Sequence, residues 1–129
     1  MAVASDPVRG VLLAAAREFN SGRWFEAHEA LEEALEDAPD DAWPLLLGLI
    51  QVAVGYHKAS QGLRTGAIRM LGLGLAKLAP LAADAGGVDL AAFRARAEDD
   101  LASLGADGSL APSRVLDPPP RLRFVRAPA

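Results

Sequence analysis

The chain contains no cysteine and few of the residues that favour β-strands. The absence of cysteine excludes disulfides, thiolate zinc fingers, iron–sulfur clusters and a thiol nucleophile. Valine, isoleucine and threonine together supply only 11 of the 129 residues, whereas alanine and leucine supply 47. Because alanine and leucine favour helices and β-branched residues favour strands, this composition excludes a predominantly β fold. At this length we expect one all-α domain of about five helices.

Excess positive charge is also missing from most of the chain. The formal net charge is −4, and residues 1–111 carry 9 basic and 16 acidic side chains. Such an acidic body repels phosphate backbones, so we expect no nucleic-acid partner. Residues 112–129 differ, because they hold four arginines and one aspartate.

No hydrophobic run is long enough for a membrane span. The longest, residues 45–56, is interrupted by Gln51 and is far shorter than the ~20 apolar residues that a span needs. We therefore expect a buried helix there and no membrane partner. The first ten residues, MAVASDPVRG, lack the basic region and apolar core of a secretory signal, so we expect a cytoplasmic protein. A homodimer, in which a second copy of the chain is the partner, stays an open possibility.

Apolar residues recur at helical spacing in five segments, at about 8–19, 23–38, 41–61, 66–81 and 90–104. Asp41 and Asp89 are expected to cap the third and fifth helices. The third segment is apolar almost all round, so we place it, with the second, at the centre of the fold. Gly48, Gly55 and Gly62 recur every seven residues and predict a stripe where another helix comes close.

A change of composition near residue 111 predicts two parts, a helical bundle over 1–111 and an extended Pro/Arg-rich tail over 112–129. Helical periodicity ends there, and residues 117–120, DPPP, are typical of polyproline II structure. Because the charge of the tail opposes that of the bundle, we expect the tail to lie on the bundle surface. Phe124 and Val125 are its expected apolar anchors.

A polar cluster occupies the second helix, in WFEAHEALEE (residues 24–33). An advance of about 100° per residue places His28 and Glu32 about 40° apart, between Leu35 on the core face and Phe25. We therefore expect both side chains to be partly buried and to contact each other or one shared cation. If they form a buried ion pair, its loss would cost several kcal/mol.

The alternative interpretation of this cluster is a metal site. An imidazole and a carboxylate one helical turn apart can bind the same cation, as two histidines do in helical zinc motifs. A third ligand would come from the third helix, where His57 is the better candidate and Gln51 the weaker. In this interpretation His28, Glu32 and His57 hold a divalent metal, zinc or manganese, in a hydrolytic enzyme.

Two strings in the first half resemble the signature of domain of unknown function family 309. They are FNSGRWFEAHEALE (residues 19–32) and GLIQVAVGYH (residues 48–57), followed by Gly62 and Gly66. Members of that family are small all-helical proteins, so the resemblance implies a helical bundle over about residues 12–80. It implies no particular reaction.

The sequence also departs from the family pattern at two positions. Asp37 stands where a tryptophan is usual, and Leu63 stands where an asparagine is usual. If that asparagine lines a site, the site is altered here. The resemblance adds Glu26, which the helical wheel places toward solvent, to the residues of interest.

We therefore expect a small binding or interaction module whose polar cluster lies between the second and third helices. The cluster comprises Glu26, His28, Glu29, Glu32, Gln51 and His57. The metal-dependent hydrolytic enzyme is the alternative function.

Overall fold

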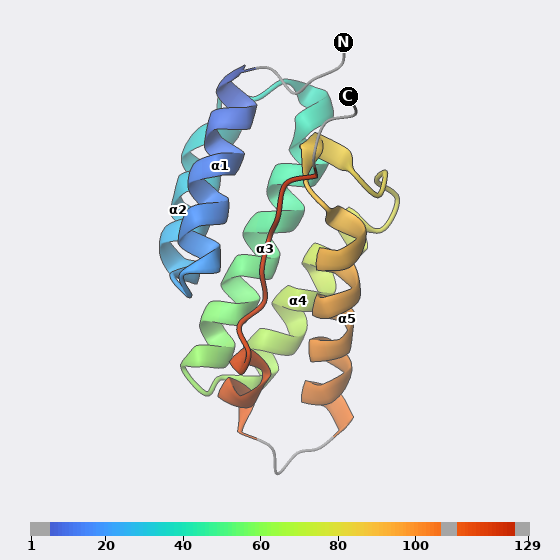
Figure 1. Cartoon of the computed structure of the whole chain (residues 1–129). Helices are drawn as coiled ribbons and strands as arrows, with labels where there is room; N and C mark the ends of the chain where they lie inside the picture. Colours follow the sequence, from blue (N-terminus) through green and yellow to red (C-terminus); the bar gives the residue numbers. More distant parts are fainter. Residues whose placement is uncertain (1–5, 107–110, 126–129) are drawn as a thin grey trace.

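Five α-helices account for most of the chain that a computed structural model describes, which covers residues 6–106 and 111–125. They are α1 (Asp6–Asn20), α2 (Trp24–Leu35), α3 (Trp43–Ser60), α4 (Arg64–Leu78) and α5 (Leu90–Ala106) (Figure 1). Three 3₁₀ turns accompany them, η1 (Asp40–Ala42), η2 (Ala85–Gly87) and η3 (Pro112–Leu116). The predicted all-α bundle of five helices is confirmed for these residues. None of the described helices is long and apolar enough to cross a membrane.

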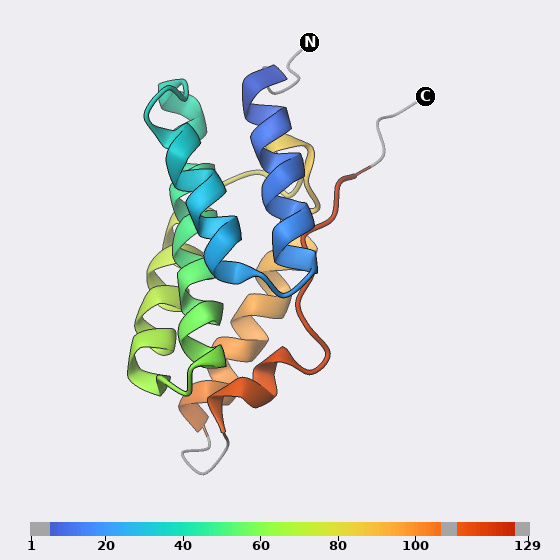
Figure 2. The same ribbon diagram turned by 90° about the vertical axis from the view of Figure 1, so that its left-hand side faces the viewer.

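Helix α3 runs through the centre of the molecule. Figures 1 and 2 show α1 and α2 on one side of it and α4 and α5 on the other. Ten residues of α3 are buried, including Leu46 and Tyr56, which have no exposed surface. Helix α2 buries only Ala27 and Leu31. The expectation that α2 shares the centre is wrong, because its outer face, rich in glutamate, meets solvent.

Small residues bring α3 and α4 close together. A Cβ atom at Gly48 would lie 2.6 Å from a Leu78 methyl, and one at Gly74 would lie 2.7 Å from the Gly48 carbonyl oxygen. The predicted stripe is thus confirmed at Gly48, and also at Gly55, which faces Leu71. Gly62 does not belong to it, since it lies beyond the end of α3 with a φ of +77°.

Two helix starts differ in how they are capped. Asp89 accepts a hydrogen bond from the Ala92 amide through Oδ1 at 3.1 Å, so the predicted cap of α5 is confirmed. The predicted Asp41 cap is wrong, because Asp40–Ala42 forms the 3₁₀ turn η1 and α3 begins at Trp43 without a side-chain cap.

The described part of the tail, up to Val125, lies along the bundle, as predicted, from η3 at one end to η2 near the other (Figure 1). Its first residues, Pro112–Leu116, form the 3₁₀ turn η3 and are not extended as predicted. Asn20 binds both backbone groups of Leu122: its Nδ2 donates to the carbonyl at 2.9 Å, and its Oδ1 accepts from the amide at 2.7 Å. The Asp89 amide donates to the Arg123 carbonyl at 2.7 Å, and the Val125 amide donates to the Gly87 carbonyl at 2.9 Å. These bonds satisfy the extended backbone, which has no helical partners of its own.

The apolar anchors of the tail agree only in part with those expected. Val115 and Leu122 are 6% and 2% exposed and join the hydrophobic core. Of the two expected anchors, Phe124 is confirmed, because it is partly buried and packs against the core, with the Arg9 guanidinium 5.5 Å from its ring centre. Val125 is exposed. Val125 fails as an anchor because its amide, and not its side chain, makes the contact with η2. Residues 126–129, including Arg126, lie outside the described residues.

Candidate functional site

A small pocket opens between the first turn of α2 and the last turns of α3. Its volume is about 200 Å³, and its lining consists of Phe25, His28, Val54, His57 and Lys58. This volume is below the range of about 300–1,000 Å³ that is usual for drug-sized ligands. The pocket therefore fits a fragment-sized molecule.

The packing of α2 against α3 brings these residues together. Gly22 adopts a φ of +77°, a conformation that glycine accepts without steric cost, and the chain reverses there into α2. Phe25 and His28 are one turn apart on α2, so both point the same way. Val54, His57 and Lys58 share one side of α3, with which α2 packs. The pocket forms where these two helix faces meet.

The orientation of the His28 ring is set by its own helix. Its Nδ1 lies 2.8 Å from the Phe25 carbonyl oxygen. A carbonyl can only accept, so Nδ1 carries a proton and Nε2 faces outward. That Nε2 lies 3.7 Å from Glu32 Oε2. The two side chains thus face each other, as the sequence predicts.

The burial of this pair differs from the expectation. The His28 side chain is 16% exposed, but the Glu32 side chain is 64% exposed. The helical wheel treats Phe25 as the buried border of the cluster, whereas Phe25 is itself 44% exposed. Because α2 buries a narrower face than the wheel assumes, Glu32 lies in solvent and the expected buried ion pair is absent.

Phe25 connects the two histidines of the chain. Its ring centre lies 5.0 Å from that of His28 and 5.2 Å from that of His57. His28 and His57, both members of the predicted cluster, thus lie beside the same phenylalanine ring and line the same pocket. The sequence assigns Phe25 a packing role, but the structure makes it the residue between them.

Lys58 lies at the other border of the pocket, against α4. A Cβ atom at Gly66 would lie 2.7 Å from the Lys58 Cδ atom, so the absence of a side chain at Gly66 makes room for the lysine stem. The Lys58 Nζ atom lies 3.6 Å from the same Cβ position, so the end of the side chain lies beside Gly66 of α4, at the border of the pocket. Sequence reasoning did not include Lys58, because a lysine near a helix end is usually solvated.

The other predicted members of the cluster lie apart from the pocket. Glu26 forms an ion pair with Arg23, its carboxylate lying 3.8 Å from Nη2. Glu29 is exposed. Gln51 is partly buried, its Oε1 has no hydrogen-bond partner, and it does not line the pocket.

The predicted metal ligands do not assemble into a metal site. Within residues 6–106 and 111–125, no group of three or more histidine, aspartate or glutamate side chains is arranged to hold a metal ion. His28, Glu32 and His57 all belong to this part of the chain. His28 lies beside Glu32, whereas His57 lines the pocket beside Phe25.

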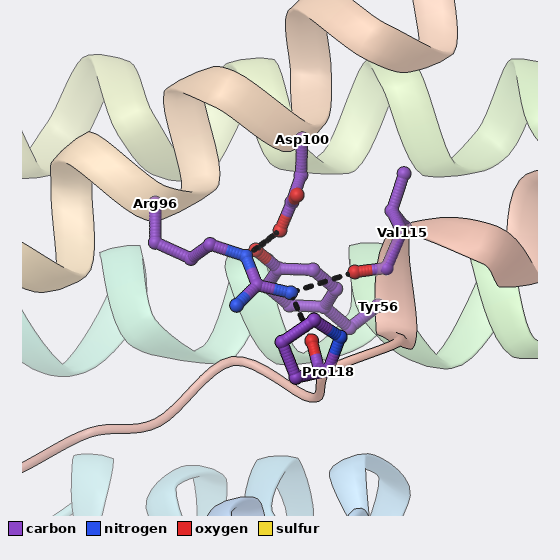
Figure 3. Close-up of polar contacts among 5 residues, drawn as sticks. All are labelled: Tyr56, Arg96, Asp100, Val115 and Pro118. Carbon is purple, nitrogen blue, oxygen red and sulfur yellow. Dashed lines mark hydrogen bonds and ion pairs between the residues drawn. The ribbon is translucent and has the colours of Figure 1, made fainter.

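A second polar centre joins α3, α5 and the tail (Figure 3). The Tyr56 hydroxyl donates to Asp100 Oδ2 at 2.5 Å, and Arg96 Nε donates to the same oxygen at 2.9 Å. Arg96 Nη2 also donates to the Val115 carbonyl at 2.8 Å and to the Pro118 carbonyl. Asp100 is 7% exposed, so these donors compensate a carboxylate that has left water.

Burial changes the titration of both acids in this centre. It raises the pKa of Tyr56, and the nearby Asp100 charge raises it further. Burial also raises the pKa of Asp100, although Tyr56 and Arg96 oppose that rise by favouring the carboxylate. Sequence reasoning missed this centre. The signal was available, because Asp100 continues the buried row of Phe93, Ala97 and Leu104 at helical spacing.

Fold and site together define a small all-α bundle with an aromatic and histidine-lined pocket between its second and third helices. The model of the family described as Domain of unknown function (DUF309) matches residues 12–70. This stretch contains every residue that lines the pocket, and the match confirms the resemblance found in the sequence. Among curated proteins, none matches the chain significantly.

Proposed function

We propose that this protein is a small-molecule-binding module and that the pocket between α2 and α3 is its binding site. One observation carries the proposal: Phe25 lies between two imidazoles, 5.0 and 5.2 Å away, at the wall of a cavity of about 200 Å³. Apolar walls with a few convergent polar groups are the usual features of a ligand site.

The distribution of polar partners supports a site that receives a ligand from outside. Within the described residues, neither the His57 ring nitrogens nor the Lys58 ammonium has a hydrogen bond or ion pair. Both residues are partly buried, and both line the cavity. A partly desolvated donor gains more from a ligand than a fully hydrated one.

Fragment binding, followed in two-dimensional NMR spectra of the backbone amides, tests the proposal. We expect some fragments to shift the signals of residues 25–28 and 54–58. Val54→Phe would fill the cavity and abolish these shifts, whereas Leu73→Phe, which introduces the same ring at an exposed site on α4, would preserve them. The proposal fails if no fragment shifts these signals, or if binding survives Val54→Phe.

The other functional expectations from the sequence stay predictions. They are the cytoplasmic location, the absence of a nucleic-acid partner and the homodimer. Analytical ultracentrifugation at several protein concentrations would test the homodimer.

A further inference from the structure

Resting on the proposed function, we infer that the ligand of the α2–α3 pocket is a small carboxylic acid with a flat apolar body. The five lining side chains complement such a molecule through their charges, their unpaired hydrogen-bonding groups and the position of their apolar surfaces.

Charge is the first argument. Among the described residues, no aspartate or glutamate lines the pocket, whereas Lys58 is a lining residue and carries an ammonium group. Residues 1–111 carry 16 acidic and 9 basic side chains, Lys58 included, so Lys58 places a positive charge at the pocket of an otherwise acidic bundle. A negative ligand group there meets an attractive field.

Hydrogen-bonding capacity is the second argument. Lys58 offers three donors and no acceptor, and His57 offers at least one N–H group in either tautomer. Neither has a polar partner in the described part of the chain. The contact of the lysine stem with Gly66 reduces the conformational freedom that Lys58 would lose on binding. A group with only acceptors, such as a carboxylate, satisfies this set.

Apolar surface is the third argument, and it separates an organic acid from an inorganic anion. Phe25 and Val54 form the apolar part of the lining, and the Phe25 ring offers a flat wall beside the two imidazoles. An aromatic or similarly flat body packs well against such rings. Inorganic phosphate would leave this wall uncovered.

A glutamate beside His28 distinguishes the His28 side of the pocket from the Lys58 side. Glu32 Oε2 lies 3.7 Å from His28 Nε2 and would repel a carboxylate placed there. The ligand carboxylate therefore belongs at Lys58 and His57, with its apolar body between Phe25 and Val54.

Three probes of graded chemistry test the inference by NMR titration: benzoate, its neutral isostere benzamide, and inorganic phosphate. We expect benzoate to bind most tightly, with saturable shifts of residues 25–28 and 54–58, and to bind severalfold more weakly at high salt. Lys58→Met keeps the stem and removes the charge, so it should weaken benzoate binding by about tenfold or more. Lys77→Met, on α4 away from the pocket, is the matched control and should change nothing.

The outcomes separate this inference from the proposed function. If benzamide binds as tightly as benzoate, or if Lys58→Met leaves benzoate binding unchanged, the ligand does not need a carboxylate. The pocket would then be one for neutral ligands. If phosphate binds more tightly than benzoate, the inference that the ligand has a flat apolar body is wrong. Binding of none of the three, together with a fragment screen that leaves the pocket signals unshifted, would refute both proposals.

Discussion

Tyr56 and Asp100, which are 44 positions apart in the sequence, meet in a hydrogen bond of 2.5 Å inside the core. Tyr56 has no exposed surface, and Asp100 is 7% exposed. The bond connects the central helix α3 with α5, and Arg96 extends the connection to the tail through the carbonyls of Val115 and Pro118. Asp100 and Arg96 together thus join α3, α5 and the tail.

Tyr56→Phe should lower the free energy of unfolding by about 1–3 kcal/mol, because the buried carboxylate loses a donor. The variant keeps the ring and its edge contact with Phe19, whose centre is 5.8 Å away. Urea denaturation measures the change. In an Asp100→Ala background the same substitution should cost less, since the two groups are coupled. An unchanged urea midpoint would contradict the role of the hydrogen bond.

Asp100 should make the stability depend on pH in an unusual direction. Burial raises its pKa in the folded state, so the folded protein binds this proton more readily than the unfolded chain. Its contribution to stability is full below the ordinary pKa of about 4 and is lost as the pH rises through the higher folded value. Relative to Asp100→Asn, the wild-type protein should therefore lose stability as the pH rises above about 4. Urea midpoints of both proteins from acidic to neutral pH measure the difference. If the stability difference between the two proteins stays constant or grows in favour of the wild type as the pH rises, Tyr56 and Arg96 affect the pKa of Asp100 more strongly than burial does.

Arg96→Met should loosen the tail. The arginine binds Asp100 and two tail carbonyls, and methionine keeps the stem but removes all three contacts. We expect trypsin to cleave faster after Arg114 and Arg121, as followed by mass spectrometry. Arg69→Met, at an exposed position of α4, is the control and should leave cleavage slow. Equally fast cleavage of the wild-type protein would show that the clamp does not hold the tail.

Two glycines of α4 should respond oppositely to alanine. A Cβ atom at Gly74 would lie 2.7 Å from the Gly48 carbonyl oxygen and 2.8 Å from the Val52 amide nitrogen, whereas one at Gly72 meets nothing within 4 Å. Gly74→Ala should destabilise the fold by about 1–3 kcal/mol through overpacking. Gly72→Ala should stabilise it by about 0.5–1 kcal/mol, since glycine is unfavourable inside a helix. Thermal melting of the two variants tests the α3–α4 contact, and similar effects would refute it.

The pair of His28 and Glu32 should contribute little to stability. Its carboxylate is 64% exposed, and exposed ion pairs are worth about 0–1 kcal/mol. Glu32→Ala should therefore change the free energy of unfolding by less than about 1 kcal/mol, much like Glu33→Ala on the solvent side of α2. A loss of several kcal/mol at Glu32 alone would show a buried pair after all.

Local patterns were sufficient to predict the helices and two of the residues that line the pocket. Apolar spacing identified all five helices, and Asp89 was recognised as a cap because capping depends on residues within one turn. His28 and His57 were identified because a histidine beside an apolar face is conspicuous in any helical wheel. The end of α2 was placed three residues late, at about Ala38 instead of Leu35, since frayed ends carry weak sequence signals.

The amino-acid sequence by itself determined the helical class, the glycine contact at Gly48 and Gly55, and the position of the tail along the bundle. The helical class and the glycine stripe follow from residue types and their spacing within single helices. The tail was placed on the bundle by its charge, although long-range hydrogen bonds and the buried Val115 and Leu122 side chains hold it there. Only the tertiary structure decided that Lys58 and Phe25 border the pocket, that Glu32 faces solvent, and that Tyr56 meets Asp100. Each depends on which face a helix turns toward its partner. The packing of all helices together sets this orientation.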